Sequence, residues 1–242
     1  MIKQKLLSII IVTFNAEKYI EKTLKSIVGQ KESDIELIII DGESKDKTME
    51  ICDRYKESID IILSESDSGI YDAMNKGIAI SSAKYVYFIG AGDTMLPDVL
   101  SQIKKELQSN IEIIYGKCYF DSDKNIYGEE MSLRKLMFKN ICHQGMFIQK
   151  KLFNQVGYYD LKYIALADWW WNIIVFYNKS ITKKFVPIVI ASYAGGGFSE
   201  VNKDTEFKKF RKDFVLRHYG VITYLILKIY IGLKYLKKFF KT

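Results

Sequence analysis

The sequence is poor in the residues that define several classes of protein. Its 242 residues include three cysteines (Cys52, Cys118 and Cys142) and no Cys-x-x-Cys or Cys/His cluster, so neither a disulfide framework nor a zinc site is expected. With two prolines and 15 glycines, the chain is not collagen-like or of low complexity. The opening MIKQKLLSIIIVTFNAE has no small-residue cleavage site and predicts a strand rather than a signal peptide. Unpaired cysteines without an export signal predict a cytoplasmic protein.

Two common nucleotide-binding motifs and one catalytic arrangement are also missing. No G-x-G-x-x-G follows a predicted strand and no G-x-x-x-x-G-K-[ST] occurs, which excludes dinucleotide-binding and P-loop sites of the usual kind. Neither of the two histidines has a serine or cysteine partner at a recognisable spacing, so a hydrolytic triad is disfavoured. The chain does have 48% apolar residues, which is enough to bury a substantial core.

The positive charge is confined to the end of the chain. Residues 201–242 hold 11 Lys and Arg against 3 Asp and Glu, a balance of +8, so residues 1–200 carry −1 of the net +7. Without a basic stripe on the folded body, no nucleic-acid partner is expected. The tail VITYLILKIYIGLKYLKKFFKT predicts a basic amphipathic helix, whose apolar face Lys228 interrupts.

Such a helix favours attachment to an anionic membrane surface, at the inner face of the cell membrane. Its apolar stretch Val221–Leu233 is about thirteen residues long, short of the roughly 20 needed to span a bilayer. The alternative is that this face packs on the protein's own body or on a second copy in a homodimer.

The first hundred residues alternate strand and helix signals. Apolar runs predict strands at 6–13, 35–41, 59–64 and 85–90, and helical spacing predicts helices at 16–28, 47–56 and 70–82. This order is typical of an α/β fold with a mostly parallel, Rossmann-like sheet flanked by helices. Ligands of such sheets bind beyond the carboxyl ends of the strands. The polar residues there are Thr13, Asn15, Asp41, Ser64, Glu65, Asp67 and Asp93.

The second half is less regular and is expected to extend the same sheet. Its predicted elements are a helix at 96–107, a hairpin at 111–130, a short helix at 132–138, a helix through 166–178 and a strand at 183–192. The expected organisation is one domain, 1–200, with halves 1–95 and 96–200, followed by the helical tail 201–242.

Three carboxylates are candidates for chemistry. Asp41, at a strand end next to Gly42, could accept hydrogen bonds from a base or ribose; it could also be a turn residue, with Ser44 or Asp46 capping the next helix. Asp93 follows glycines at 90 and 92 that allow close approach of a ligand. Beside a diphosphate it suits Mg²⁺ or Mn²⁺, but it could equally end a strand or cap a helix.

Asp168, in ALADWWW, has the apolar setting in which the pKa of a carboxyl group rises towards that of a general base. A tryptophan such as Trp169 could stack on a sugar. Alternatively, Asp168 caps a helix and the tryptophans are core. The glycine run containing Gly196 could cover a phosphate or form a plain turn.

Together these segments resemble the family 2 inverting glycosyltransferases of the GT-A fold, from Leu7 to about Ser199. The resemblance is carried by SIIIVTFNAEKYIEKTLKSI, IIIDGESKDKT, SESDSGIYDAMNKGI, YVYFIGAGD, HQGMFI, VGYYD, ALAD and GGGFS. It implies that Thr13, Phe14, Asn15 and Glu17 lie at the nucleotide, that Asp41 binds the base, usually uracil, and that Asp67, Asp72, Asn75 and Gly92 lie near the donor. It further implies Asp93 as ligand of a divalent metal, Asp168 as catalytic base, and His143, Gln144, Trp169 and Gly196 near the acceptor or diphosphate.

Two positions depart from the family pattern. Ala91 replaces the first carboxylate of the Asp-x-Asp metal motif, and Ala167 stands where the base often has an acidic neighbour. The resemblance implies metal-dependent transfer of a sugar, with inversion, from a nucleotide-diphospho-sugar (usually UDP-linked) to a lipid-linked or oligosaccharide acceptor in cell-surface glycan assembly. The alternatives are a non-catalytic, membrane-associated nucleotide-binding scaffold of the same fold, and a nucleotidyltransferase, for which TFNAEKY lacks the glycine-rich basic loop.

Overall fold

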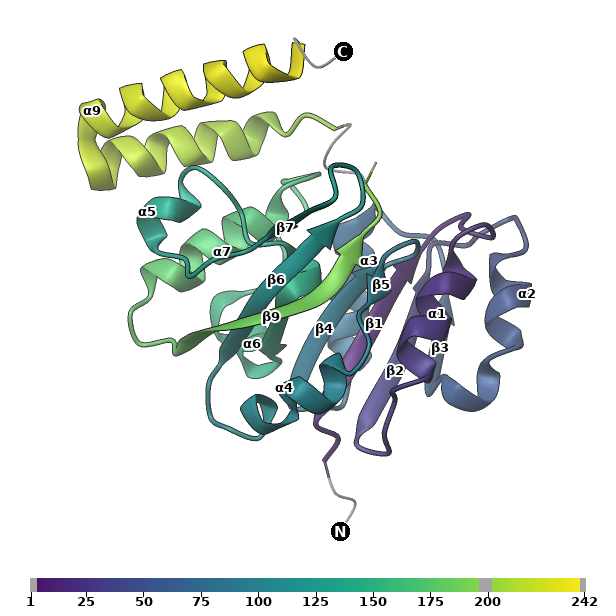
Figure 1. Cartoon of the computed structure of the whole chain (residues 1–242). Coiled ribbons are helices and arrows are strands. Elements are labelled where there is room, and N and C mark those ends of the chain that lie inside the picture. The colour runs from purple at the N-terminus through teal and green to yellow at the C-terminus, as the bar shows by residue number, and fades with distance from the viewer. Residues whose placement is uncertain (1–3, 196–201, 240–242) are drawn as a thin grey trace.

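The computed structural model describes residues 4–195 and 202–239, and the described strands form one sheet (Figure 1). The strands are β1 (Leu7–Thr13), β2 (Ile35–Asp41), β3 (Ile61–Ser64), β4 (Tyr85–Gly90), β5 (Thr94–Met95), β6 (Ile113–Phe120), β7 (Asn125–Tyr127), β8 (Met146–Gln149) and β9 (Lys183–Tyr193). They lie in the order β3-β2-β1-β4-β8-β6-β9-β5, and β7 pairs with β6.

The four strands β3, β2, β1 and β4 are parallel, as the alternation of strand and helix signals predicts. All residues of β1 and β2 are buried, because helices cover both faces of this half of the sheet. The strands are in register at their carboxyl ends: Thr13 lies opposite Asp41, and Asp41 lies opposite Ser64. The polar residues that follow these strands are therefore brought to one edge.

The second half continues the same sheet with mixed strand directions. β8 runs antiparallel to both β4 and β6, β9 is parallel to β6, and β5 is antiparallel to β9. The predicted hairpin is the antiparallel pair β6 and β7. The parallel order thus applies to the first four strands, and the sheet is mixed beyond them.

Helices pack on both faces of the sheet. They are α1 (Ile20–Val28), α2 (Thr48–Asp53), α3 (Ile70–Ile80), α4 (Val99–Leu107), α5 (Leu133–Leu136), α6 (Lys151–Val156), α7 (Ala167–Tyr177) and α9 (Thr205–Phe239), with 3-10 turns η1 (Lys56–Ser58) and η2 (His143–Gly145). Strand alternation separates two cores: Ile10 packs in the cluster that includes α3 and α7, and Ile9 in the cluster that includes α1 and α4.

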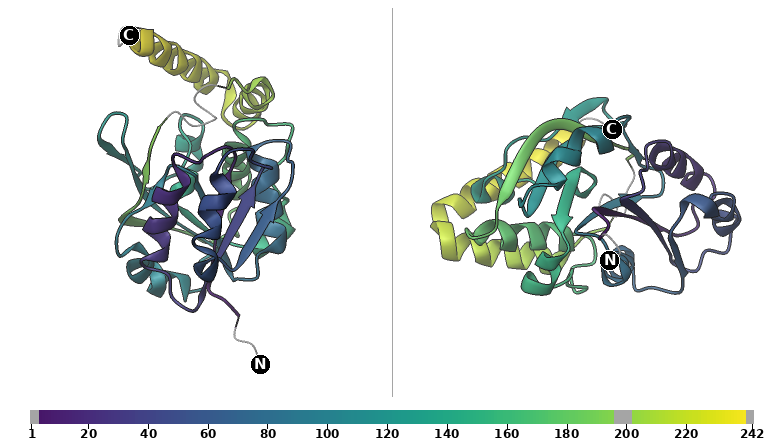
Figure 2. Two further views of the ribbon diagram at one scale, coloured as in Figure 1. Left: turned by 90° about the vertical axis from the view of Figure 1, so that its right-hand side faces the viewer. Right: turned by 90° about the horizontal axis from the view of Figure 1, so that it is seen from below.

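Helix α9 is a bent pair of arms rather than one straight tail helix. Gly220 adopts φ 77° and ψ 177°, a backbone conformation that favours glycine, and the chain reverses there (Figure 1). By length and composition Thr205–Leu233 could cross a membrane, but the bend divides it. The first arm buries Phe207 and Val215 against the body. Seen from below, the two arms of α9 (yellow-green to yellow) lie on the side of the molecule opposite the N-terminal strands and helices (Figure 2, right).

Candidate active site

Asp41 is held at the end of β2 by hydroxyl and amide donors. Its carboxylate is fully buried; Oδ2 accepts from the Ser44 amide (2.9 Å) and the Ser64 hydroxyl (2.6 Å), and Oδ1 accepts from the Ser44 hydroxyl (2.5 Å). Asp46, rather than Ser44, accepts from the amide of Thr48 at the start of α2 (3.0 Å). Asp41 is thus fixed in place: both lone pairs of Oδ2 are used, and one lone pair of Oδ1 is not.

The loop after β1 is joined to this segment through backbone groups. Asn15, at φ 47°, donates its amide to the Ser44 hydroxyl (2.7 Å) and accepts from the Lys45 amide (2.9 Å). Glu17 accepts from the amide of Lys47 (3.0 Å). These contacts attach the loop after β1 to the segment before α2.

Two side chains at this loop, those of Thr13 and Phe14, could contact a ligand. The Thr13 hydroxyl is buried and, within the described residues, makes no hydrogen bond. Since buried polar groups are nearly always paired, this hydroxyl points to a ligand partner. The Phe14 side chain beside it is 63% exposed, a free aromatic face at the edge of the sheet. Such a face suits stacking of a base.

The segment before α3 contributes one acid to the same place. A Cβ added to Gly42 would lie 2.8 Å from Asp67 Oδ2 and 3.2 Å from Phe14 Cδ2, so Asp67 and Phe14 meet over Gly42. Asp72 accepts from the Ser68 amide (2.9 Å) and orders the loop before α3. The Asn75 side chain donates to the Tyr159 carbonyl (2.9 Å) and accepts from the Tyr159 amide (3.0 Å). Its predicted place beside the donor nucleotide-sugar therefore stays a prediction.

Asp93 follows β4 and is 6% exposed. Its Oδ2 accepts from Gln144 Nε2 (2.6 Å) and its Oδ1 accepts from the Ala194 amide (3.0 Å). Burial raises the pKa of the Asp93 carboxyl above the usual aspartate value, and these two hydrogen bonds and the nearby His143 oppose the rise. Gly92, at φ 109°, allows the sharp turn that points Asp93 inward.

The residues at Asp93 fit a divalent metal only as a single protein ligand. No group of three or more His, Cys, Asp or Glu side chains suitable for a metal occurs in the described residues, and Ala91 contributes no carboxylate. Each Asp93 oxygen has one lone pair free of the hydrogen bonds described above. Mg²⁺ or Mn²⁺ bound here would take its other ligands from a diphosphate and water.

Asp168 lies in the first turn of α7 and is 8% exposed. It does not cap the helix, because the N-cap position is Leu166. Its Oδ1 accepts from the Tyr71 hydroxyl (2.6 Å) and its Oδ2 accepts from Asn140 Nδ2 (2.7 Å). Within the described residues no cation forms an ion pair with this carboxylate, so it is a buried acid held by neutral donors.

The aromatic residues after Asp168 have different environments. Trp171 is fully buried and donates to the Gly157 carbonyl (2.8 Å), which makes it core. Trp169 donates to the Leu136 carbonyl (2.6 Å) and lies under the Arg211 guanidinium at 4.8 Å. Its stacking on a sugar stays a prediction, and the predicted Gly196 lies outside the described residues.

Residues 140–144 connect the two buried carboxylates. Asn140 binds Asp168 and Gln144, four residues later, binds Asp93. Five consecutive residues span at most about 15 Å, so one short segment supplies a side-chain donor to each of the two acids. Tyr71 and Asn140 are the residues that sequence reasoning missed. Tyr71 precedes the predicted Asp72, and Asn140 lies three residues before the predicted His143. Closeness in sequence to predicted site residues is therefore the signal that could have found them.

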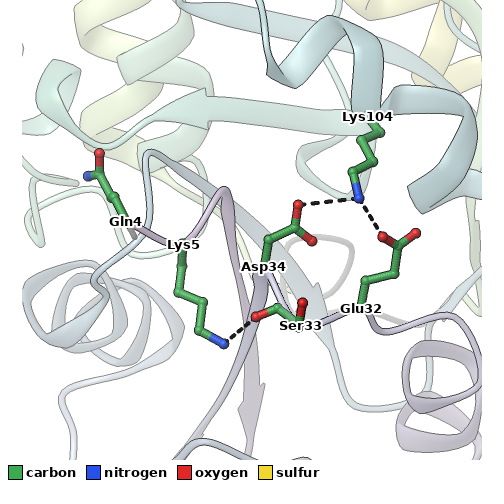
Figure 3. A pocket seen from close by; sticks show the side chains of 6 residues that line it. All are labelled: Gln4, Lys5, Glu32, Ser33, Asp34 and Lys104. Atoms are coloured by element: carbon green, nitrogen blue, oxygen red, sulfur yellow. Dashed lines mark hydrogen bonds and ion pairs between the residues drawn. The ribbon is translucent and has the colours of Figure 1, made fainter. Parts of the chain in front are cut away.

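A separate cavity of about 330 Å³ opens at the amino-terminal edge of the sheet (Figure 3). It is lined by Gln4, Lys5, Glu32, Ser33, Asp34 and Lys104. Lys104 pairs with Glu32 and with Asp34 (3.3 Å), and Lys5 donates to the Ser33 carbonyl (2.7 Å). Lys104 is paired within the cavity and Lys5 pairs with Asp60 beside it (3.9 Å), and the cavity lies at the edge opposite to the carboxylates described above.

The parallel βαβ half, with polar loops at its carboxyl edge, is typical of α/β proteins that bind a nucleotide at that edge, and the second half adds a buried acid. The chain belongs to glycosyl transferase family 2, whose model matches residues 8–196. A PGL/p-HBAD biosynthesis glycosyltransferase of Mycobacterium bovis (strain BCG / Pasteur 1173P2) is 35% identical over 210 residues, which cover 84% of this chain and 82% of the relative.

Solved structures of glycosyltransferases share the fold. TarS 1–349 of S. aureus in complex with UDP-GlcNAc superposes with a TM-score of 0.72 at 15% identity, over 87% of this chain and 66% of that chain. This chain thus spans just under two thirds of that TarS structure. Glucosyl-3-phosphoglycerate synthase of Mycobacterium tuberculosis, in complex with Mn²⁺, UDP and phosphoglyceric acid, gives 0.57 at 16% identity, over 81% and 74%. The fold of this chain is therefore GT-A, and it is a glycosyltransferase that uses a nucleotide-sugar donor.

Proposed function

We propose that the protein transfers a sugar, with inversion, from a UDP-linked donor to a hydroxyl group of a lipid-linked or oligosaccharide acceptor in cell-surface glycan assembly. The observation that carries the proposal is the pair of buried carboxylates, Asp93 and Asp168, attached to one five-residue segment beside the nucleotide loops. UDP and Mn²⁺ are supported by the complexes of the structural neighbours.

Each side chain has one role in this proposal. Phe14 stacks on the base, and Asp41 accepts hydrogen bonds from its ring N–H or from ribose. Asp168 removes the proton from the acceptor hydroxyl as that oxygen attacks the anomeric carbon. The bond from that carbon to the diphosphate oxygen breaks, and the electron pair leaves with the nucleotide. A single displacement from the opposite face inverts the configuration.

Asp93 is the residue that would hold the divalent metal. When bound, the metal offsets the negative charge of the departing diphosphate. Gln144 and the Ala194 amide keep the Asp93 carboxylate in one orientation, and Gly92 permits the turn that presents it.

Calorimetric titration of UDP, with and without Mn²⁺, tests the donor site. We expect metal-dependent binding that Asp93→Ala removes and that Asp34→Asn, at the opposite edge of the sheet, leaves intact. GDP serves as the competing nucleotide. Binding of UDP that is indifferent both to Mn²⁺ and to Asp93 would contradict the proposed metal site.

The second candidate is a non-catalytic nucleotide-binding scaffold of the same fold, favoured by the absence of a carboxylate at Ala91. The two functions differ in the effect of Asp168→Asn on UDP release from UDP-sugars in the presence of glycolipid acceptors. An enzyme that uses Asp168 as its base loses turnover, whereas a scaffold shows no turnover to lose.

We further propose that the protein is cytoplasmic and attaches to the inner face of the cell membrane through the second arm of α9. Six large apolar side chains on this arm are 47–77% exposed: Val221, Ile222, Leu225, Ile226, Ile229 and Leu233. Residues 221–242 contain five lysines and no acidic residue, which suits an anionic lipid surface. The arm lies beyond the edge where β1 and β4 end, so a lipid-linked acceptor would reach the site from the membrane (Figure 1).

Sedimentation with anionic vesicles tests this attachment. We expect Leu225→Glu with Ile229→Glu to abolish binding, because two charges would enter the apolar boundary. Ile126→Glu is the matched control, since Ile126 is equally exposed (56%) but lies on β7. A double variant that still sediments would refute membrane attachment through this face. A wild-type dimer that the double variant makes monomeric would instead assign the face to a second copy.

A further inference from the structure

The carboxylate of Asp168 is held at both oxygens by uncharged side chains from two distant parts of the chain. The Tyr71 hydroxyl comes from α3, 97 residues away, and the Asn140 amide from the segment before η2. A carboxylate held at one point rotates within a broad torsional well, whereas two donors on opposite oxygens fix its plane. Asp168 therefore has one orientation before any acceptor binds.

We propose that Tyr71 and Asn140 are positioning residues, which aim the free lone pairs of Asp168 at the acceptor hydroxyl. The inference rests on the proposed role of Asp168 as the catalytic base and adds the residues through which its geometry is set. General-base efficiency depends on hydrogen-bond geometry to the hydroxyl, so an orienting pair acts on the rate of transfer more than on donor binding.

The orientation of the Asn140 amide is itself fixed. Asn172 Nδ2 donates to Asn140 Oδ1 (2.9 Å), which leaves the Asn140 NH₂ group directed at Asp168. An ionised carboxylate only accepts hydrogen bonds, so a donor is what it requires there. Asn172 lies one turn after Asp168 on α7 and is 2% exposed. The hydrogen bonds from Asn172 to Asn140 and from Asn140 to Asp168 are therefore buried inside the protein.

The two positioning residues also connect the base to the donor side. Tyr71 lies in the first turn of α3, directly after the loop that carries Asp67. Asn140 lies four residues before Gln144, the partner of Asp93. Asp168 is therefore oriented by the same segments that hold the donor-binding groups. This fixes the position of the attacking hydroxyl relative to the leaving group.

Single-group deletions test the proposal on the full chain. Tyr71→Phe removes one hydroxyl and keeps the ring, and Asn140→Ala removes the amide. For each we expect kcat to fall by about 10- to 100-fold, with acceptor KM and UDP affinity within about twofold of wild type. The matched control is Tyr159→Phe: its ring lies 5.4 Å from that of Tyr71, but no hydrogen bond to Asp168 from its hydroxyl is found in the described residues.

A second readout separates orientation from folding. Asn140→Asp keeps the shape but places a second carboxylate against Asp168, so the acidic limb of the kcat/KM profile is expected to move to higher pH. Within the part of the chain that the structure describes, the phenols of Tyr71 and Tyr159 face Asp168, and burial raises their pKa values well above the usual range, so they stay neutral. An unmoved acidic limb in Asn140→Asp would count against the proposal.

Asp168→Asn distinguishes this inference from the proposed function. If Asp168→Asn retains transfer, Asp168 is not the base, and both its proposed role and the positioning inference are wrong, although the transferase function stands. If Asp168→Asn is inactive while Tyr71→Phe and Asn140→Ala keep the wild-type kcat, the function stands and the positioning role is wrong. Loss of kcat in all three, with UDP affinity retained, is the result we expect.

Discussion

Replacing Asp204 tests whether the first arm of α9 belongs to the catalytic body. Asp204 is 2% exposed and precedes the arm. Its Oδ1 accepts from the Phe207 amide (2.9 Å), and its Oδ2 accepts from the amides of Ala165 (3.0 Å) and Leu166 (3.1 Å). One carboxylate thus caps α9 and fixes the residues from which α7 starts.

The size of the effect follows from these three bonds. Loss of a helix cap costs about 1 kcal/mol. Each of the amides of Ala165 and Leu166 would lose its acceptor in a buried place, at about 1 kcal/mol or more apiece. Asp204→Ala is therefore expected to reduce the free energy of unfolding by about 3 kcal/mol, which lowers Tm by roughly 6–12 °C for a domain of this size.

Asp204→Ser separates the two contributions. A serine side chain caps a helix but is too short to reach Ala165 and Leu166 as well, so it should recover about 1 kcal/mol relative to alanine. Urea unfolding measures the stability of both variants. Because α7 carries Asp168, kcat should fall in both variants at temperatures where they remain folded.

A result within about 1 kcal/mol of wild type for Asp204→Ala would refute this reasoning. It would mean that burying the Asp204 charge costs as much as its three hydrogen bonds contribute. The first arm would then be an appendage whose contacts with α7 are energetically neutral.

Three further outcomes are expected. Gly77→Ala puts a Cβ 2.5 Å from Ile10 Cγ2, and the overpacking, about 1–3 kcal/mol, should exceed the gain in helix propensity in urea unfolding. Because burial raises the pKa of Asp93, calorimetry over a pH series should show Mn²⁺-dependent UDP binding being lost, as pH falls, at a higher pH than the ordinary aspartate value of 3.8. Gly220→Ala strains the bend by about 1–3 kcal/mol and should raise hydrogen exchange around the buried Leu227, while the first arm keeps its protection. Unchanged stability of Gly77→Ala would contradict the first prediction. Loss of UDP binding only near pH 3.8 would contradict the second, and unchanged hydrogen exchange in Gly220→Ala would contradict the third.

The parallel half of the fold could be predicted because its strands are continuous apolar runs, buried on both faces. Helix boundaries were less predictable. The helix expected from Ala16 begins at Ile20. Before it, the amide of Ala16 bonds to the Thr48 hydroxyl (2.7 Å) and that of Glu17 to Asp46 (3.0 Å). These contacts with a segment about 30 residues away belong to the loop after β1, and local periodicity does not record them.

The tail shows a similar limit. A single period of about 100° per residue predicts one apolar face, which Lys228 interrupts. The second arm in fact has two apolar sides, one packed on the body through Leu227 and Ile231 and one exposed through Leu225 and Ile229. Packing on the body and an exposed apolar face are therefore both present, on opposite sides of one helix. The sequence contained both stripes but not the bend at Gly220 that separates the arms.

The contacts that set the geometry of Asp168 join residues far apart in the chain, and for that reason the sequence motif could name the acid but not its partners. Burying an ionised carboxylate without a cation costs stability, and two neutral donors compensate only in part. Asp93 and Asp168 are both buried, and the segment 140–144 gives each one side-chain donor, Gln144 to Asp93 and Asn140 to Asp168. A scaffold that only bound nucleotide would need neither the second acid nor its two donors. The arrangement around Asp168 therefore favours turnover over passive binding.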